Sequence, residues 1–223
     1  MSLDRNRCES CGADLPASRG PVTCSFCGAV FRPTGVGGAG QLLLAADLRS
    51  SEVPGWNRYH QDKWSAAGGV LTARCPVQAA NLALLATPGP LGDFDATMTV
   101  RFLEGAPTQA HAGFEARNST AGFYSVSLSM QGTFQIGRYD GKSWAPPLVS
   151  WAAHPAVRKE AGAPCAVRIV LSGKTIRLFL NGQLATSVQD PTLAQGALRV
   201  YVNPSGAATV VELSELEVRE PAA

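Results

Sequence analysis

After residue 40, hydrophobic and polar residues alternate along most of the chain, a pattern typical of half-buried β-strands. In residues 93–103, DFDATMTVRFL, every second side chain from Phe94 to Phe102 is apolar. Residues 122–130, GFYSVSLSM, alternate in the same way, with serines between the apolar positions. Successive side chains of a strand point to opposite faces, so both segments predict strands with one face against a core. No segment keeps a helical period over three turns.

Further strands are predicted between turn signals. Their residue ranges are 41–48, 68–75, 81–87, 112–117, 133–140, 166–173, 175–188, 196–202 and 208–219. Asp140-Gly141 is a hairpin signal, and Asn181-Gly182 is the dipeptide favoured by type I′ turns. Many short strands, each with one apolar face, predict an all-β fold in which two antiparallel sheets form a sandwich.

Composition supports this fold class and reduces the number of expected partner classes. The chain has 223 residues, and charged residues make up 16%, against a usual share of about 25%, which disfavours helical bundles and coiled coils. A hydrophobic share of 45% is enough to bury a core, and the length allows one sandwich plus a small appendage. The formal charge of +2 does not call for nucleic acid or an anionic membrane as partner.

Four cysteines near the N-terminus form the most specific motif of the chain. Cys8 and Cys11 make one C-x-x-C pair, and Cys24 and Cys27 make a second, twelve residues later. Two such pairs supply four thiolates in a tetrahedron, so residues 1–31 are predicted to be a zinc ribbon with one structural Zn²⁺. Redox pairs and disulfides are the alternatives. Redox pairs usually accompany a βαβ pattern, which this sequence lacks.

The predicted ribbon carries little charge that could attract nucleic acid. Residues 1–35 contain four arginines and three acidic residues, and four thiolates with one Zn²⁺ turn this formal +1 into −1. Nucleic-acid binding is therefore disfavoured, and a ribbon that contacts a protein partner or is purely structural is expected instead. Residues 32–40, RPTGVGGAG, predict a flexible linker to a sandwich domain over 41–219, followed by a tail at 220–223.

The first ten residues lack the apolar core of a signal peptide, and no apolar stretch is suited to span a membrane. We therefore expect a cytoplasmic protein whose thiols stay reduced. Cys75 and Cys165 lie in or beside apolar strands and are predicted to be buried and unpaired.

The order of strands after residue 40 resembles concanavalin A-like jelly-roll sandwiches. It looks most like the bacterial laminin-G-like and 3-keto-disaccharide-hydrolase-type domains. The resemblance rests on the AGFYSVSLSM strand, the R-Y-D-G turn and the I-R-L-F-L-N-G-Q hairpin. It implies the jelly-roll fold, but it does not fix an activity, because such sandwiches serve as sugar binders, protein binders and hydrolases. It also leaves open whether a calcium ion is bound.

Glycosidases of this type can carry Glu-x-Asp-x-Glu on one strand, and the nearest counterpart is Glu212, Glu215 and Glu217. These three lack the central aspartate, and Glu212 is out of phase with the others. A bulge near Ser214 would explain the pattern without catalysis, leaving Glu215 and Glu217 in solvent. The apolar side chains that would then face the core are Val211, Leu213, Leu216 and Val218. No phosphate loop, GxSxG elbow or HExxH motif occurs.

We therefore expect a non-enzymatic binding module that recognises a protein or a glycan through the ribbon or a sandwich face. A structural or assembly protein that docks through the ribbon, and a glycosidase-like hydrolase, are the alternatives. For a glycan, the concave face is predicted to carry the site. Its aromatic platform would come from Tyr139, Trp144 or Trp151, and its polar anchors from Glu115, Arg117 and Arg138. Alternatively, Trp144 and Trp151 pack beneath the loop 141–163.

Overall fold

The computed structural model describes residues 22–23, 30–31, 40–46, 48, 56–58, 63–76, 82–86, 90–105, 110–204 and 206–221. The chain divides into two units, one of residues 1–40 with 222–223 and one of residues 41–221. In the first unit, β1 (Val22–Thr23) pairs antiparallel with β2 (Val30–Phe31). The four cysteines of the predicted zinc ribbon, and the predicted linker apart from Gly40, lie outside the described residues.

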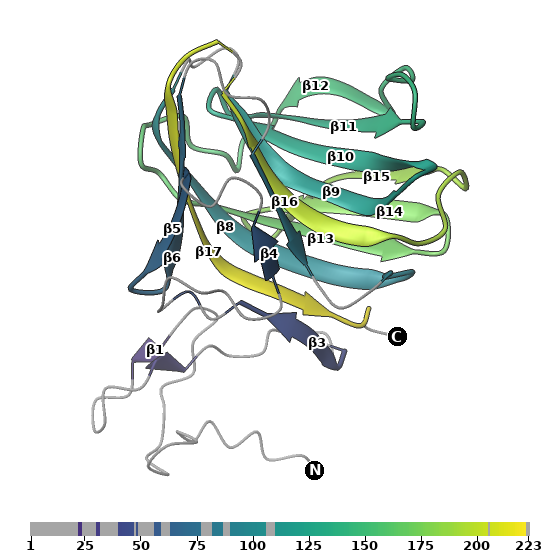
Figure 1. The fold of residues 1–223 in the computed structure, drawn as a ribbon, viewed down its shortest axis with the longest axis horizontal. Helices are drawn as coiled ribbons and strands as arrows, with labels where there is room; N and C mark the ends of the chain where they lie inside the picture. The colour runs from purple at the N-terminus through teal and green to yellow at the C-terminus, as the bar shows by residue number, and fades with distance from the viewer. Residues whose placement is uncertain are drawn as a thin grey trace. The chain divides into compact units, whose positions relative to one another are not determined.

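The second unit is a sandwich of two antiparallel sheets (Figure 1). One sheet has seven strands in the order β12 (Val149–Ala153), β11 (Thr133–Tyr139), β10 (Gly122–Ser129), β9 (His111–Ser119), β16 (Ala197–Asn203), β7 (Leu82–Ala86) and β4 (Trp56–Arg58). The other has eight. Seven follow the order β15 (Gln183–Gln189), β14 (Thr175–Leu180), β13 (Cys165–Ser172), β8 (Phe94–Glu104), β17 (Thr209–Arg219), β6 (Val70–Cys75) and β5 (Trp64–Ala67), and β3 (Leu42–Ala45) also pairs with β17.

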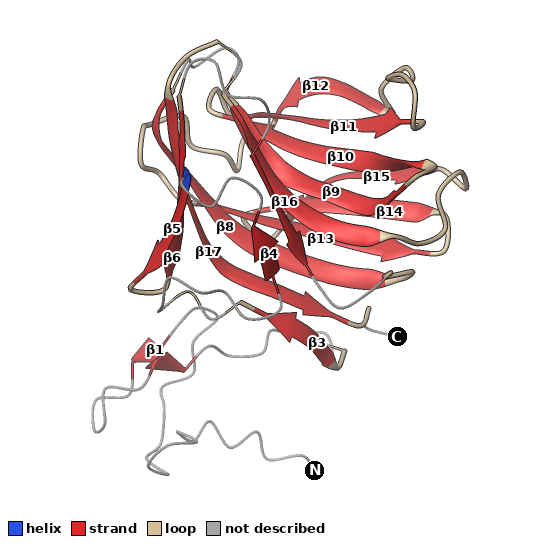
Figure 2. Ribbon diagram, in the orientation of Figure 1, coloured by secondary structure: helices blue, strands red, loops and turns tan. Residues whose placement is uncertain are grey.

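This architecture confirms the predicted all-β, two-sheet antiparallel sandwich, and it is consistent with a jelly roll. Strands dominate the ribbon coloured by secondary structure (Figure 2). The described residues include no helix that could span a membrane. β4, β5 and β12, which have three to five residues each, were not predicted.

The core fills the space between the two sheets. On β8, the apolar side chains from Phe94 to Phe102 are buried at alternate positions, as their pattern predicts. Tyr124, Val126 and Leu128 face them from β10. Cys75 and Cys165 are buried and unpaired, which confirms their prediction, and burial raises the pKa of both thiols to about 11.

The bulge predicted near Ser214 is confirmed. The pairing of β17 with β8 shifts between Ser214 and Glu217, and Glu215 has a φ of 58°. The four apolar neighbours are all buried: Val211, Leu213, Leu216 and Val218. Glu215 accepts a hydrogen bond from Thr99 Oγ1 at 2.9 Å, and Glu212 lies 3.6 Å from Arg101. These glutamates therefore line the side of the eight-stranded sheet that faces away from the core.

Both turn signals form as predicted, with one difference. Asn181 and Gly182 have φ values of 48° and 79°, as a type I′ turn requires. At Asp140-Gly141 the turn spans four residues, because Tyr139 pairs with Trp144 across Asp140–Ser143. The longer turn brings Trp144 back beside β11.

Candidate functional site on the seven-stranded sheet

The outer face of the seven-stranded sheet, which points away from the core, carries three rows of residues fixed by strand register. The first row is Gly137, Ser125, Glu115 and Arg199. The second row is Gln135, Ser127, Gly113 and Tyr201. The third row is Thr133, Ser129, His111 and Asn203. Most of these side chains are polar, and the strands hold them at fixed spacing.

Tyr201 forms the centre of this outer face. Its hydroxyl lies 3.0 Å from Ser125 Oγ and within hydrogen-bond distance of Ser127 Oγ. Tyr201 is on β16 and the serines are on β10, so the phenol ring crosses the intervening strand β9. Gly113 of β9, which pairs with Tyr201, has no side chain in its way. Burial raises the pKa of the Tyr201 hydroxyl to about 12, so it stays neutral.

Glu115 and Arg199 form a mostly buried pair next to Tyr201. The Glu115 side chain is only 8% exposed, and its Oε2 lies 3.5 Å from Arg199 Nη1. Asn118 Nδ2 donates a second hydrogen bond to the same oxygen at 3.0 Å. Burial raises the pKa of Glu115, and the charge of Arg199 and the two hydrogen bonds only partly oppose this. The pair and the Asn118 hydrogen bond therefore hold the Glu115 carboxyl in a fixed position beside Tyr201.

Trp144 lies at one end of the outer face. The Asp140 carboxylate accepts the backbone N–H groups of Lys142 and Ser143, which fixes the turn before it. The indole rests on Gly137, where an added Cβ would lie 3.2 Å from the ring. Phe123 meets it edge-on, with ring centroids 5.5 Å apart. Trp144 is nevertheless 57% exposed, so its free face is open to solvent.

Trp151 lies at the other end. Its ring makes an edge contact with His111, with centroids 5.7 Å apart, and His111 makes a similar contact with Tyr201 at 5.8 Å. Three strand spacings, about 14 Å, separate β12 from β9, so the Trp151 and His111 side chains reach toward each other over β11 and β10. Trp151 is 44% exposed. Neither tryptophan is packed beneath the 141–163 loop, so that alternative is wrong.

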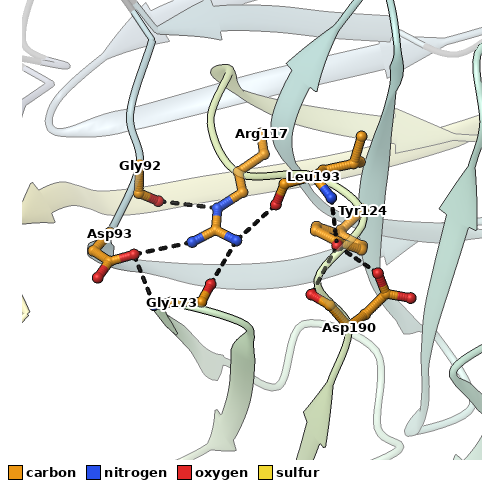
Figure 3. A network of polar contacts seen from close by, with 7 residues as sticks. All are labelled: Gly92, Asp93, Arg117, Tyr124, Gly173, Asp190 and Leu193. Carbon is orange, nitrogen blue, oxygen red and sulfur yellow. Dashed lines mark hydrogen bonds and ion pairs between the residues drawn. The ribbon is translucent and has the colours of Figure 1, made fainter.

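Four of the six residues predicted for ligand binding thus lie on or beside this outer face: Glu115, Tyr139, Trp144 and Trp151. Arg117 does not, which corrects its expected position. Its φ of 51° breaks the alternation of β9, and the guanidinium is 1% exposed. It donates to the carbonyl oxygens of Gly92, Gly173 and Leu193 and pairs with Asp93 at 3.0 Å (Figure 3).

Arg138 is also turned away from the outer face. It pairs in register with Tyr124, whose side chain lies in the core. Its guanidinium forms an ion pair with Asp190 and donates to Thr192 Oγ1 at 2.7 Å. The Tyr124 hydroxyl donates to Asp190 Oδ1 and accepts the Leu193 N–H (Figure 3). Both arginines therefore connect distant segments of the sandwich and do not point onto the outer face of the seven-stranded sheet.

Sequence reasoning missed Tyr201, Arg199 and His111. The alternation of residues 196–202, GALRVYV, contained the signal for two of them. Leu198, Val200 and Val202 face the core there, so Arg199 and Tyr201 must face outward. Within the described residues, no three or more His, Cys, Asp or Glu side chains gather as a metal site would require.

Solved structures with the same fold include glycan-binding and glycoside-hydrolase domains. The carbohydrate-binding module CBM66 from Bacillus subtilis matches with a TM-score of 0.57 and 13% identity, over 74% of this chain and 96% of that one. LamA from Z. galactanivorans, solved in complex with laminaritriose and laminaritetraose, gives 0.63 and 8%, over 82% and 100%. The GH43 protein BlXynB from Bacillus licheniformis gives 0.57 and 12%, over 79% and 39%. No protein-family model matches the sequence, and neither does any curated protein.

Proposed function

We propose that the outer face of the seven-stranded sheet binds a glycan and does not cleave it. The observation that carries this proposal is the pair of exposed indoles, Trp144 and Trp151, held over rows of polar side chains. Sugars present apolar C–H faces that stack on aromatic rings and hydroxyl groups that bond to polar side chains. Both kinds of partner meet on this outer face.

The packing of the indoles favours binding. Phe123 and Tyr139 hold Trp144 by edge contacts, and His111 holds Trp151. Side chains that are already ordered lose less conformational entropy when a ligand arrives. The solved glycan-binding structures of the same fold support the proposal at the level of architecture only.

Binding is favoured over hydrolysis by the carboxylates. Glycosidases of the common type use two carboxyl groups that flank the scissile bond. In strands β9–β12 and β16, all of which the structure describes, Glu115 is the one carboxylate. It is already engaged by Arg199 and Asn118.

The test is a glycan microarray probed with the full-length protein. We expect at least one glycan to be retained by the wild-type protein and lost by Trp144→Ala. Leu184→Ala is the matched control, because Leu184 is 54% exposed on β15 of the other sheet. The retained glycan should release no reducing ends on prolonged incubation. An array without any retained glycan would contradict the proposal, and a protein ligand for the same indoles would then be favoured.

We also propose that Cys8, Cys11, Cys24 and Cys27 hold one structural Zn²⁺ and that the ribbon contacts a protein partner. The spacing of the two C-x-x-C pairs supports the metal. The nearly neutral charge of residues 1–35 supports a protein over nucleic acid.

A further inference from the structure

The two exposed indoles lie at different rows of the outer face. Trp144 rests on Gly137 in the first row, and Trp151 contacts His111 in the third. Along β11, the first row at Gly137 and the third row at Thr133 are four positions apart, a distance of about 13 Å at 3.3 Å per residue. A ligand that reaches from the Trp144 position over Gly137 to the row of His111, which Trp151 contacts, must span about that distance.

The line between the indoles runs along the strands. Trp144 lies over β11, and Trp151 extends from β12 over β11 toward the His111 side chain of β9. Both rings therefore lie on the β11 side of the sheet, and the rows that they touch are displaced in the strand direction. A chain-like ligand on both rings would follow β10 and β11.

Among the described residues of β9–β12 and β16, the side chains that face outward between the indoles carry no unpaired charge. The second row offers the amide of Gln135 and the hydroxyls of Ser127 and Tyr201. The two oppositely charged side chains of the rows, Glu115 and Arg199, face each other at 3.5 Å. Groups of this kind bind the hydroxyls of neutral sugars and offer nothing to a row of carboxylates or sulfates.

We infer that this outer face takes a neutral glycan chain of several sugar units, lying along β10 and β11 with one unit on each indole. A single terminal sugar would leave one of the two rings without a ligand. The inference rests on the proposed function and adds to it the length, direction and charge of the ligand.

The experiment is a calorimetric titration of the full-length protein with oligosaccharide ladders. Laminari-, cello-, xylo- and manno-oligosaccharides of one to six units are the neutral probes, and oligogalacturonides of the same lengths are the acidic probe. We expect affinity in at least one neutral series to rise about tenfold or more with length and then to level off once the chain reaches both indoles. The acidic series should bind more weakly at every length.

Variants separate the two rings. Trp144→Ala and Trp151→Ala should each lower the affinity for the hexasaccharide about tenfold and remove the rise with length, while Leu184→Ala leaves the titration unchanged. Far-ultraviolet circular dichroism checks that each variant folds. Equal affinity for one and six units, indifference to Trp151→Ala, a preference for the acidic series, or no binding of any neutral series would each overturn the inference. The microarray decides the proposed function separately, so a glycan retained there would leave that function intact.

Discussion

Gly113 and Gly137 both lie on the outer face, but a Cβ added at each position would meet different atoms. At Gly113 an added Cβ would collide with the backbone carbonyl oxygen of Val126, which cannot move without breaking the β9–β10 pairing. At Gly137 the nearest atom belongs to the exposed ring of Trp144, at 3.2 Å. We expect Gly113→Ala to lower the free energy of unfolding by about 3 kcal/mol or more, and Gly137→Ala by about 1 kcal/mol or less. Urea unfolding of both variants checks this, and equal losses would contradict the assigned packing.

Glu115 should make the free energy of unfolding of the protein depend on pH. Burial raises its pKa in the folded state above the unfolded value of about 4.3, so the ionised form lowers stability at neutral pH. That loss disappears as pH falls below the unfolded pKa. Relative to Glu115→Gln, the wild-type protein should therefore become more stable between pH 7 and about pH 4. Thermal unfolding of both proteins across this range measures the gap, and a gap that moves the other way would show that the Arg199 pair outweighs burial.

The cysteine pairs make a prediction about metal content. Purified protein should contain one zinc per chain by elemental analysis, and Cys24→Ser should lose it, because three thiolates hold the ion less well than four. Cys75→Ala is the control and should keep the zinc, since Cys75 is buried in the sandwich. Protein without zinc, or equal zinc in both variants, would contradict the ribbon.

At the scale of strands and turns, Arg117 joins segments that are far apart in the sequence. Its guanidinium connects β9 to the segment before β8, to the β13–β14 turn and to the β15–β16 connection (Figure 3). Its replacement leaves three carbonyl oxygens without this donor. The Asp93 partner is 47% exposed, so the ion pair itself contributes less than a fully buried one.

We therefore expect Arg117→Met to lower the free energy of unfolding by about 3 kcal/mol, mainly through lost hydrogen bonds. Arg177→Met, at an exposed position of β14, should change it by less than about 0.5 kcal/mol. Chemical denaturation measures both. The hydrogen-bond partners of the Arg117 guanidinium include neither indole, so the folded Arg117→Met protein should keep its glycan affinity. A loss of affinity in the folded variant would place Arg117 in the binding site after all.

Arg117 also shows which features of the structure a local sequence pattern does not predict. Alternation correctly predicted most strands, and the interruption at Ser214 correctly predicted the β17 bulge, because both depend on local pattern. Arg117 was expected on the outer face because strict alternation puts it two positions after Glu115. The left-handed backbone of Arg117 instead turns its side chain away from the outer face. That orientation depends on carbonyl groups far along the sequence, to which the guanidinium donates. The contact of Trp151 with His111 likewise depends on strand order, which no local pattern reveals.

At the scale of the whole sandwich, its two outer faces differ in chemistry. The outer face of the eight-stranded sheet carries ion pairs, with Arg168 bound to Asp95 at 2.8 Å and Arg219 to Glu217 at 3.1 Å. These four charges are paired beside solvent. The outer face of the seven-stranded sheet also carries the Glu115–Arg199 pair, but it exposes two indoles among amide and hydroxyl groups. This difference is why we assign the ligand to the seven-stranded sheet.

The same difference leads to a prediction about salt. Stacking and neutral hydrogen bonds are hardly screened by ions, whereas contacts between exposed charges weaken over this range as the Debye length shrinks. Raising sodium chloride from about 0.05 M to about 0.5 M should therefore change the Kd for the retained glycan less than about twofold. Titrations of the full-length protein at both concentrations measure this. A tenfold loss of affinity would assign the ligand to the charged outer face of the eight-stranded sheet, and Arg168→Gln would then weaken binding where Trp151→Ala does not.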